Sequence, residues 1–233
     1  MSWTLTEFEH NADLVPVLAA KIAAVLAAAV HARGRAALAV SGGSTPRTLF
    51  DALSVLDIPW SRVTITLVDE RWVAETDPDS NALLVRRHLL QHLAARARFV
   101  GLKTDAGDPF LACFDIEARL RTKVLPLDVV VLGMGEDGHT ASFFPAAEGL
   151  EMALQNTQRA CCGIRPPLAP HPRMTLSLQT LLGAEHLFLH IVGAKKRAVL
   201  DVAMTPGSIP GLPVRAVLHQ SRVPLEIHYA EKA

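Results

Sequence analysis

The segment that most constrains the fold is an apolar strand that runs directly into a glycine-rich polar turn. Leu127-Asp-Val-Val-Val-Leu132 is rich in β-branched residues, as in a strand that is buried on both faces of a sheet. Three glycines then fall among Glu136, Asp137 and His139 before Pro145 closes the segment. Glycine allows a sharp turn and the close approach of another molecule. In open parallel sheets, this end of the strands is where ligands bind.

The polar turn supports two interpretations. Imidazole titrates near neutral pH, so His139, with two carboxylates just before it, can be an acid–base centre. Alternatively, its polar residues only cap a helix that follows a glycine turn. Local chemistry favours neither interpretation, and the choice depends on the rest of the chain.

Composition is typical of a globular protein without a highly charged partner. Half of the 233 residues are hydrophobic and a fifth are charged, which argues against disorder. The 23 basic and 23 acidic residues give zero net charge, whereas nucleic-acid and membrane-surface binding favour a basic excess. We therefore expect no nucleic acid and no membrane as partners.

The cysteines and the N-terminal region predict a cytoplasmic protein. Cys113, Cys161 and Cys162 lack metal-ligand spacing, and two adjacent cysteines are poorly placed for a structural disulfide. The N-terminal residues lack the basic and apolar regions of a signal peptide. The apolar stretch 14–30 contains Lys21 and is expected to be too short to span a bilayer.

A second strand runs into a loop that is suited to an anion. Ala36–Val40 is apolar, Ser41-Gly-Gly-Ser-Thr-Pro46 follows, and a helical pattern begins at Arg47. Free backbone N–H groups and the positive end of the helix dipole meet at such a loop, and hydroxyl groups add donors. The pattern is neither a P-loop nor a GxGxxG motif, so it does not indicate a nucleotide. The alternative is a Ser or Thr N-cap followed by proline.

Strands and helices alternate along the chain, which predicts an α/β fold with a mostly parallel central sheet and helices on both faces. We expect an edge strand at 1–10, then Asn11 or Asp13 capping an alanine-rich helix with Pro16 in its first turn and Gly34 at its end. We find no internal repeat, so one domain is the simplest prediction. The other predicted strands are 63–68, 99–103, 127–132, 173–178, 187–192 and 225–229; the other predicted helices are 82–93, 110–121, 146–154, 180–184 and 194–203, with a structured loop at 162–172.

Charged residues follow two further strands. Asp69-Glu-Arg-Trp-Val73 comes directly after one predicted strand, and Gly193-Ala-Lys-Lys-Arg197 comes after another. Such residues are commonly solvated, but the carboxyl ends of parallel strands also share one cleft, where a lysine near an anion site becomes a candidate ligand. We interpret the remaining histidines, among them His88, His171 and His190, as surface or core residues.

Three segments together resemble the 6-phosphogluconolactonase family: Ser41–Pro46, Asp69–Val73 and Gly133–Pro145. Their order and spacing match over nearly the whole chain. The first segment is also similar to that of glucosamine-6-phosphate deaminases. Deaminase-like sequences, however, follow the Asp-Gly-His motif with a glutamate that assists ring opening, and they have tyrosine at the position of Arg71. Here the motif continues Thr140-Ala-Ser-Phe-Phe-Pro145, so the resemblance is to the lactonases.

The resemblance implies a fold like that of the deaminases and of ribose-5-phosphate isomerases, as a single domain over residues 1–233. It also implies hydrolysis of 6-phospho-D-glucono-1,5-lactone to 6-phospho-D-gluconate in the oxidative pentose phosphate pathway. No metal and no organic cofactor is expected, and the partner is a small sugar phosphate bound by a monomer or weak homodimer. A deaminase or isomerase of amino sugar phosphates and a non-catalytic sugar-phosphate sensor remain as alternatives.

Lactone hydrolysis needs an activated water, a stabilised oxyanion and a proton for the departing ring oxygen. His139 is our candidate for the general base and later proton donor, because imidazole can serve both steps near neutral pH. Asp137 is expected to orient its ring, and Arg71 to bind substrate or to stabilise the negative charge. The residues expected to bind the phosphate are Gly42, Gly43, Ser44, Thr45, Lys196 and Arg173.

Overall fold

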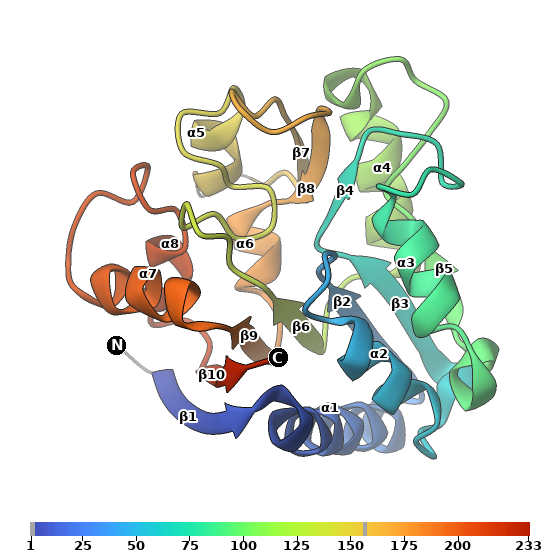
Figure 1. The fold of residues 1–233 in the computed structure, drawn as a ribbon. Coiled ribbons are helices and arrows are strands. Elements are labelled where there is room, and N and C mark those ends of the chain that lie inside the picture. The colour runs from blue at the N-terminus through green and yellow to red at the C-terminus, as the bar shows by residue number, and fades with distance from the viewer. Residues whose placement is uncertain (1–2, 156–157) are drawn as a thin grey trace.

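The central sheet is parallel throughout, as the alternation of strands and helices predicted (Figure 1). The computed structural model describes residues 3–155 and 158–233, and within them seven strands form this sheet. The expected edge strand is confirmed as β1. In spatial order the strands are β1 (Trp3–His10), β10 (Leu225–Lys232), β9 (His186–Val192), β6 (Val129–Leu132), β2 (Ala36–Val40), β3 (Val63–Leu67) and β5 (Arg98–Val100).

The order of the strands reverses between β2 and β6. From β2 the chain continues outward to β3 and β5, and it then returns to the other side of β2 to build β6, β9 and β10. The loops that leave the carboxyl ends of β2 and β6 therefore diverge and open a crevice between them, which is the usual ligand position in such sheets. The two polar turns that the sequence singled out, 41–46 and 133–145, are these loops.

Three short strands form a second, antiparallel sheet that the sequence did not predict. They are β4 (Asp69–Arg71), β8 (Arg173–Leu176) and β7 (Cys161–Ile164). The interpretation of 69–73 and of 162–172 as loops is therefore wrong in part. A three-residue strand of charged side chains has no alternating apolar pattern, so the sequence carries no strand signal for β4.

The long alanine-rich helix is α1 (Asn11–Arg33). It ends as predicted, because Gly34 adopts a φ of 73° and donates its N–H to the Val30 carbonyl at 2.8 Å. The predicted cap is wrong, since His10 is the N-cap residue and no side chain bonds to the start of the helix. Pro16 lies in the second turn of the helix rather than the first.

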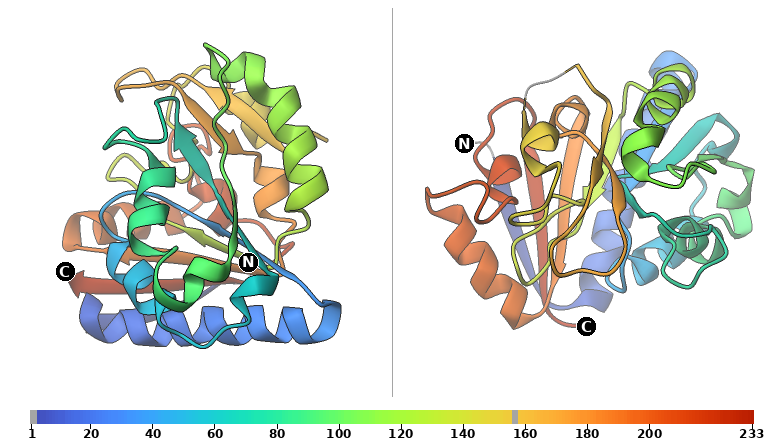
Figure 2. Two further views of the ribbon diagram at one scale, coloured as in Figure 1. Left: turned by 90° about the vertical axis from the view of Figure 1, so that its right-hand side faces the viewer. Right: turned by 90° about the horizontal axis from the view of Figure 1, so that it is seen from above.

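By length and apolar composition alone, α1 could cross a membrane, so the expectation that this stretch is too short is wrong. One apolar face of the helix, with Leu14, Leu18, Ile22 and Leu26, is fully buried in the core. Figure 2 shows α1 along one side of the large sheet and the small sheet on the opposite side. The pattern is that of a core helix with one face against a sheet.

Two helices are shorter than predicted because left-handed residues interrupt them. The helix predicted at 82–93 stops before His92, which has a φ of 46°. The helix predicted at 146–154 keeps only its last turn, because Ala146 and Gly149 have φ values of 56° and 89°. The remaining helices are α2 (Arg47–Ser54), α3 (Asn81–His88), α4 (Pro109–Lys123), α5 (Leu150–Leu154), α6 (Leu178–Leu181), α7 (Ala194–Met204) and α8 (Arg215–Leu218), with 3₁₀ turns at Trp60–Arg62 and His92–Arg96.

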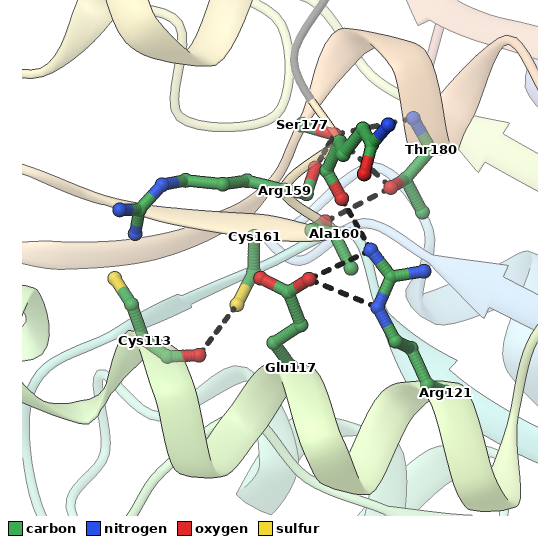
Figure 3. Close-up of polar contacts among 9 residues, drawn as sticks. Cys113, Glu117, Arg121, Arg159, Ala160, Cys161, Ser177 and Thr180 are labelled. Atoms are coloured by element: carbon green, nitrogen blue, oxygen red, sulfur yellow. Dashed lines mark hydrogen bonds and ion pairs between the residues drawn. The ribbon is translucent and has the colours of Figure 1, made fainter.

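The three cysteines are free and buried, one on α4 and two on β7, and Figure 3 shows Cys113 and Cys161 facing each other. The Cys161 thiol donates to the Cys113 carbonyl at 3.6 Å, beside the Glu117–Arg121 ion pair on α4. Burial raises the pKa of Cys162 to about 12. These thiols therefore belong to the packing that attaches the small sheet to the rest of the molecule.

Candidate active site

A cavity of about 220 Å³ lies at the carboxyl ends of β2, β6 and β9, where the strand order reverses. It joins three segments that are far apart in the sequence: the 41–46 loop, the 133–141 turn and the start of α7. Asp137 and Arg173 do not line it directly. The predicted site residues in its wall are Gly42, Gly43, Ser44, Thr45, Arg71, His139 and Lys196.

The 41–46 loop presents free donors to this cavity. The Ser41 N–H donates to the Val131 carbonyl at 3.0 Å, which fixes the loop to β6. Gly43 has a φ of 96°, which favours glycine, and no atom lies within 4 Å of the position of an added Cβ. The hydroxyls of Ser44 and Thr45 have no partner in the described part of the chain.

The alternative interpretation of this loop, a Ser or Thr N-cap, is wrong. Pro46 is the N-cap residue of α2, and no side chain caps the helix. The backbone N–H groups of 42–45 also donate to no other group within 3–155 and 158–233. Free N–H groups and hydroxyls before a helix N-terminus form a site that suits a phosphate.

His139 and Asp137 form a pair in a tight turn after β6. The Gly135 N–H donates to the His139 carbonyl at 2.9 Å, and the His139 ring nitrogen Nδ1 lies 2.5 Å from Asp137 Oδ1. Burial acts to raise the pKa of Asp137, but the hydrogen bond and charge of His139 outweigh it, so the pKa is lowered. An ionised Asp137 holds the proton on Nδ1 and leaves Nε2 as a base.

Two contacts fix the position of the His139 ring. The ring stacks on Phe144, with 4.1 Å between centroids. On the other side, a Cβ on Gly135 would lie only 2.2 Å from the ring atoms Cε1 and Nδ1. Glycine is therefore required at this position, because the imidazole passes directly over the backbone.

Arg71 and Arg173 face each other across the small sheet, on β4 and β8. Arg71 Nη1 donates to the Asp79 carbonyl at 2.5 Å. Arg173 is buried, its guanidinium lies 5.7 Å from the Phe144 ring centroid, and its Nε and Nη1 have no partner among the described residues. Burial lowers the pKa of Arg173, against the effect of nearby Asp69. Two neighbouring guanidinium groups, one with two nitrogens unpartnered among the described residues, favour binding of an anion, although Asp69 and Glu70 offset part of their charge.

A buried carboxylate positions Arg71, and the sequence did not single it out. Glu70 accepts hydrogen bonds from the backbone N–H groups of Arg71, Asn81 and Ala82, at 2.7–2.8 Å, and from the Ser80 hydroxyl. It therefore joins β4 to the N-terminus of α3, where a negative charge is favoured. Burial raises its pKa, and the three backbone hydrogen bonds oppose that effect.

The residues of the cavity wall that were not predicted as site residues include Asp69, Asn81 and His190. Asp69 accepts from the Ser142 hydroxyl at 2.6 Å, and the Asn81 amide donates to the Asp69 carbonyl at 2.9 Å. The position of Asp69 at the end of a strand was an available signal. His190 carried no such signal, because a histidine inside an apolar strand is usually a core residue.

Lys196 supplies a cation to the cavity from the first turn of α7. Burial lowers the pKa of Lys196, and Glu136 acts in the opposite direction. Lys196 and the 41–46 loop therefore line the same cavity, whereas Arg173 is paired with Arg71 in the small sheet. Among the described residues, no cluster of three or more His, Cys, Asp or Glu side chains is placed to hold a metal ion.

Fold and site together are those of an α/β protein with one cavity that is lined by the 41–46 loop and by a histidine paired with an aspartate. The family model for glucosamine-6-phosphate isomerases/6-phosphogluconolactonase matches residues 9–225. The chain belongs to this family, which confirms the resemblance and the fold class that the sequence indicated.

Curated relatives and solved structures that resemble the chain over nearly its whole length are named 6-phosphogluconolactonases. A 6-phosphogluconolactonase of Rhizobium meliloti is 45% identical over 99% of this chain and 100% of the relative. One from Pseudomonas aeruginosa is 46% identical over 91% of this chain and 88% of the relative. The crystal structure of a 6-phosphogluconolactonase from Shewanella baltica has a TM-score of 0.95 and 44% identity, and the match covers 99% of this chain and 97% of that one.

Proposed function

We propose that this chain hydrolyses 6-phospho-D-glucono-1,5-lactone to 6-phospho-D-gluconate, as part of the oxidative pentose phosphate pathway. The observation that carries the proposal is the cavity lined by both the 41–46 loop and His139, whose ring is paired with Asp137 just outside the cavity lining. The names of its relatives support the same substrate. The turn also continues as Thr140-Ala-Ser-Phe-Phe-Pro145, without the glutamate of deaminase-like sequences.

The phosphate of the substrate binds to the backbone N–H groups and hydroxyls of 42–45, with the positive charge of Lys196 beside it. This anchors the end of the substrate that does not react. The lactone carbonyl is then held near His139 at a fixed distance, so binding energy is used for orientation.

His139 Nε2 takes a proton from a water molecule, whose oxygen attacks the lactone carbonyl carbon. Asp137 keeps the other ring nitrogen protonated and stabilises the imidazolium that forms. The tetrahedral intermediate collapses, the bond from the carbonyl carbon to the ring oxygen breaks, and His139 returns its proton to that oxygen. The product is a hydroxy acid, which ionises to the carboxylate.

The negative charge that develops on the carbonyl oxygen requires a donor. Arg71 lines the cavity and is fixed by Asp79, so it is the side chain that we assign to this charge. Arg173 lies opposite Arg71, has two nitrogens without a partner in the part of the chain that the structure describes, and adds to the positive charge there. In this proposal Arg173 acts at the reacting end of the substrate, and not at the phosphate as the sequence analysis expected.

The test is hydrolysis of freshly prepared 6-phosphogluconolactone, followed by pH-stat and corrected for spontaneous hydrolysis. We expect saturable catalysis, together with no ammonia release from glucosamine 6-phosphate. Ammonia release without lactone hydrolysis would make the chain a deaminase and would contradict the proposal.

The enzyme that we propose acts in the cytoplasm as a monomer or weak homodimer, with neither nucleic acid nor membrane as a partner. The balance of 23 basic and 23 acidic residues supports this, because it gives no net attraction to anionic polymers or lipid surfaces. The burial of the apolar face of α1 within the core is also consistent with it.

A further inference from the structure

His190 is a buried residue of the cavity wall that the mechanism above does not use. It lies near the end of β9 and is only 2% exposed. Its Nε2 is 2.9 Å from the Asn11 side-chain oxygen, and the Asn11 amide nitrogen donates to the Thr48 hydroxyl at 3.0 Å. Its other ring nitrogen, Nδ1, is buried and has no hydrogen-bond partner among the described residues.

The contacts of Asn11 determine which nitrogen of His190 carries the proton. The amide nitrogen of Asn11 is engaged with Thr48, so its oxygen faces the imidazole and must accept from Nε2–H. Nδ1 is then an unprotonated acceptor. Burial, and then the charges of His228 and Lys196, lower the pKa of His190 to about 4, so the ring is neutral near neutral pH.

His190 lies on β9, which β6 separates from β2 and its 41–46 loop, although Lys196 is close enough for its charge to act on His190. In the sheet, Leu189 pairs with Leu132 of β6, so His190 comes level with the start of the 133–139 turn, and Lys196 lies in the first turn of α7. Figure 1 shows α7 directly after β9, beside β6. A neutral acceptor adds nothing for a phosphate dianion, which also has only acceptor atoms. A hydroxyl group can donate to it, and a buried acceptor without a donor is costly.

We propose that His190 Nδ1 accepts a hydrogen bond from a hydroxyl group of the bound sugar, which makes His190 a specificity-determining residue of this site. The proposal rests on the proposed function, because the hydroxyl belongs to a polyhydroxylated lactone. Asn11 and Thr48 are positioning residues, since they reach the substrate only through the tautomer of His190.

Two substitutions separate the roles of the two ring nitrogens. His190→Gln keeps an amide nitrogen near the position of Nε2, so the contact with Asn11 is retained while the acceptor is lost. His190→Asn keeps an amide oxygen near the position of Nδ1 and loses the contact with Asn11. The matched control is His228→Gln, because His228 is equally buried, pairs with His190 across β10 and β9, and lies outside the cavity.

The kinetic test compares kcat/KM for 6-phosphogluconolactone with kcat/KM for its 2-deoxy, 3-deoxy and 4-deoxy analogues. We expect the kcat/KM of His190→Gln to be about tenfold lower than that of wild type on the parent lactone. On the one analogue that lacks the donating hydroxyl, the two kcat/KM values should be equal. His190→Asn should recover part of the loss, and His228→Gln should not change the pattern. An equal loss on the parent and on all three analogues, or no loss, would overturn the proposal.

A binding test gives a readout that does not depend on turnover. By calorimetry, His190→Gln should weaken 6-phosphogluconate binding about tenfold and leave inorganic phosphate binding unchanged. Equal weakening of both ligands would mean that His190 binds the anion, and the proposal would be wrong. A third outcome separates the two proposals. If 6-phosphogluconate binding depends on His190 as described but the wild-type protein does not hydrolyse the lactone, the proposed function is wrong and the role of His190 in binding stands.

Discussion

A single methyl group at Gly135 would displace the proposed catalytic pair. The Cβ of Gly135→Ala would lie 2.2 Å from the His139 ring and 2.6 Å from Asp137 Oδ1, so both side chains must shift. We expect kcat to fall about 10²-fold, because a displacement of about 1 Å is enough for such a loss, with little change in KM. Steady-state kinetics measures this. Gly107→Ala is the control, since nothing lies within 4 Å of its added Cβ, and it should keep wild-type kcat.

Arg173 is expected to destabilise the free protein and to strengthen binding of the anionic product. Within the described residues, two nitrogens of its buried guanidinium have no partner, and it faces Arg71, so Arg173→Met should raise the melting temperature of the free protein. The same variant should gain less melting temperature from 6-phosphogluconate than wild type does. Thermal unfolding with and without the product measures both effects. A variant that is less stable than wild type when free would show that Arg173 is a structural residue.

Among the candidate site residues, the sequence indicated those whose signal is local. His139 and Asp137 stand among glycines after a strand, and Ser44 and Thr45 precede a helix, so their chemistry is visible in a few neighbouring residues. His190 was not predicted because its neighbours are apolar and its partner, Asn11, lies 179 residues away. Asn11 was expected to cap a helix, but its side chain is used for Thr48 and His190 instead.

At the scale of elements, Glu70 links β4 to α3. Its carboxylate accepts four hydrogen bonds and is 1% exposed, and a glutamine side chain can satisfy these donors only in part. Glu70→Gln should lower the free energy of unfolding by about 2–4 kcal/mol and raise KM, because Arg71 and Asn81 lose their support. Urea denaturation measures the first effect. Glu75→Gln is the control, because its ion pair with Arg86 is exposed and contributes little.

The sequence predicted the elements that have a clear hydrophobic periodicity, and it did not predict the elements that depend on long-range contacts. The strands of the large sheet are apolar and β-branched, as at Val129–Leu132, where all four residues are buried. β4 consists of three charged residues and exists because β8 and Glu70 satisfy its polar groups. The helix expected at 146–154 had apolar residues at suitable spacing, but Ala146 and Gly149 turn the backbone into a loop.

At the scale of the whole molecule, the two ends of the chain lie side by side. β1 pairs with β10 over their full length, from Trp3 with Leu225 to His10 with Lys232. Removing either end would therefore expose the other strand. We propose that residues 1–233 form a single domain, which should unfold in one cooperative transition.

Buried histidines make this domain sensitive to acid. The folded pKa of His190, about 4, lies below the unfolded value of about 6.5, so the unfolded chain binds one more proton between these values. The stability that this histidine contributes is complete above the unfolded pKa and is lost as the pH falls toward the folded pKa. The full loss is about 3 kcal/mol. Urea unfolding across this range should show it, and His190→Gln should flatten the profile; an unchanged slope in the variant would contradict the assignment.

The central claim is that His139 activates the water that opens the lactone. The most direct measurement is kcat for 6-phosphogluconolactone in wild type and in His139→Asn, corrected for spontaneous hydrolysis. His88→Asn is the matched control, because His88 also pairs with a carboxylate, Asp51 at 2.9 Å, but lies outside the cavity. We expect His139→Asn to lose about 10²–10⁴-fold in kcat with little change in KM and in melting temperature, while the control keeps wild-type turnover. A His139→Asn enzyme with kcat near that of wild type would contradict the account.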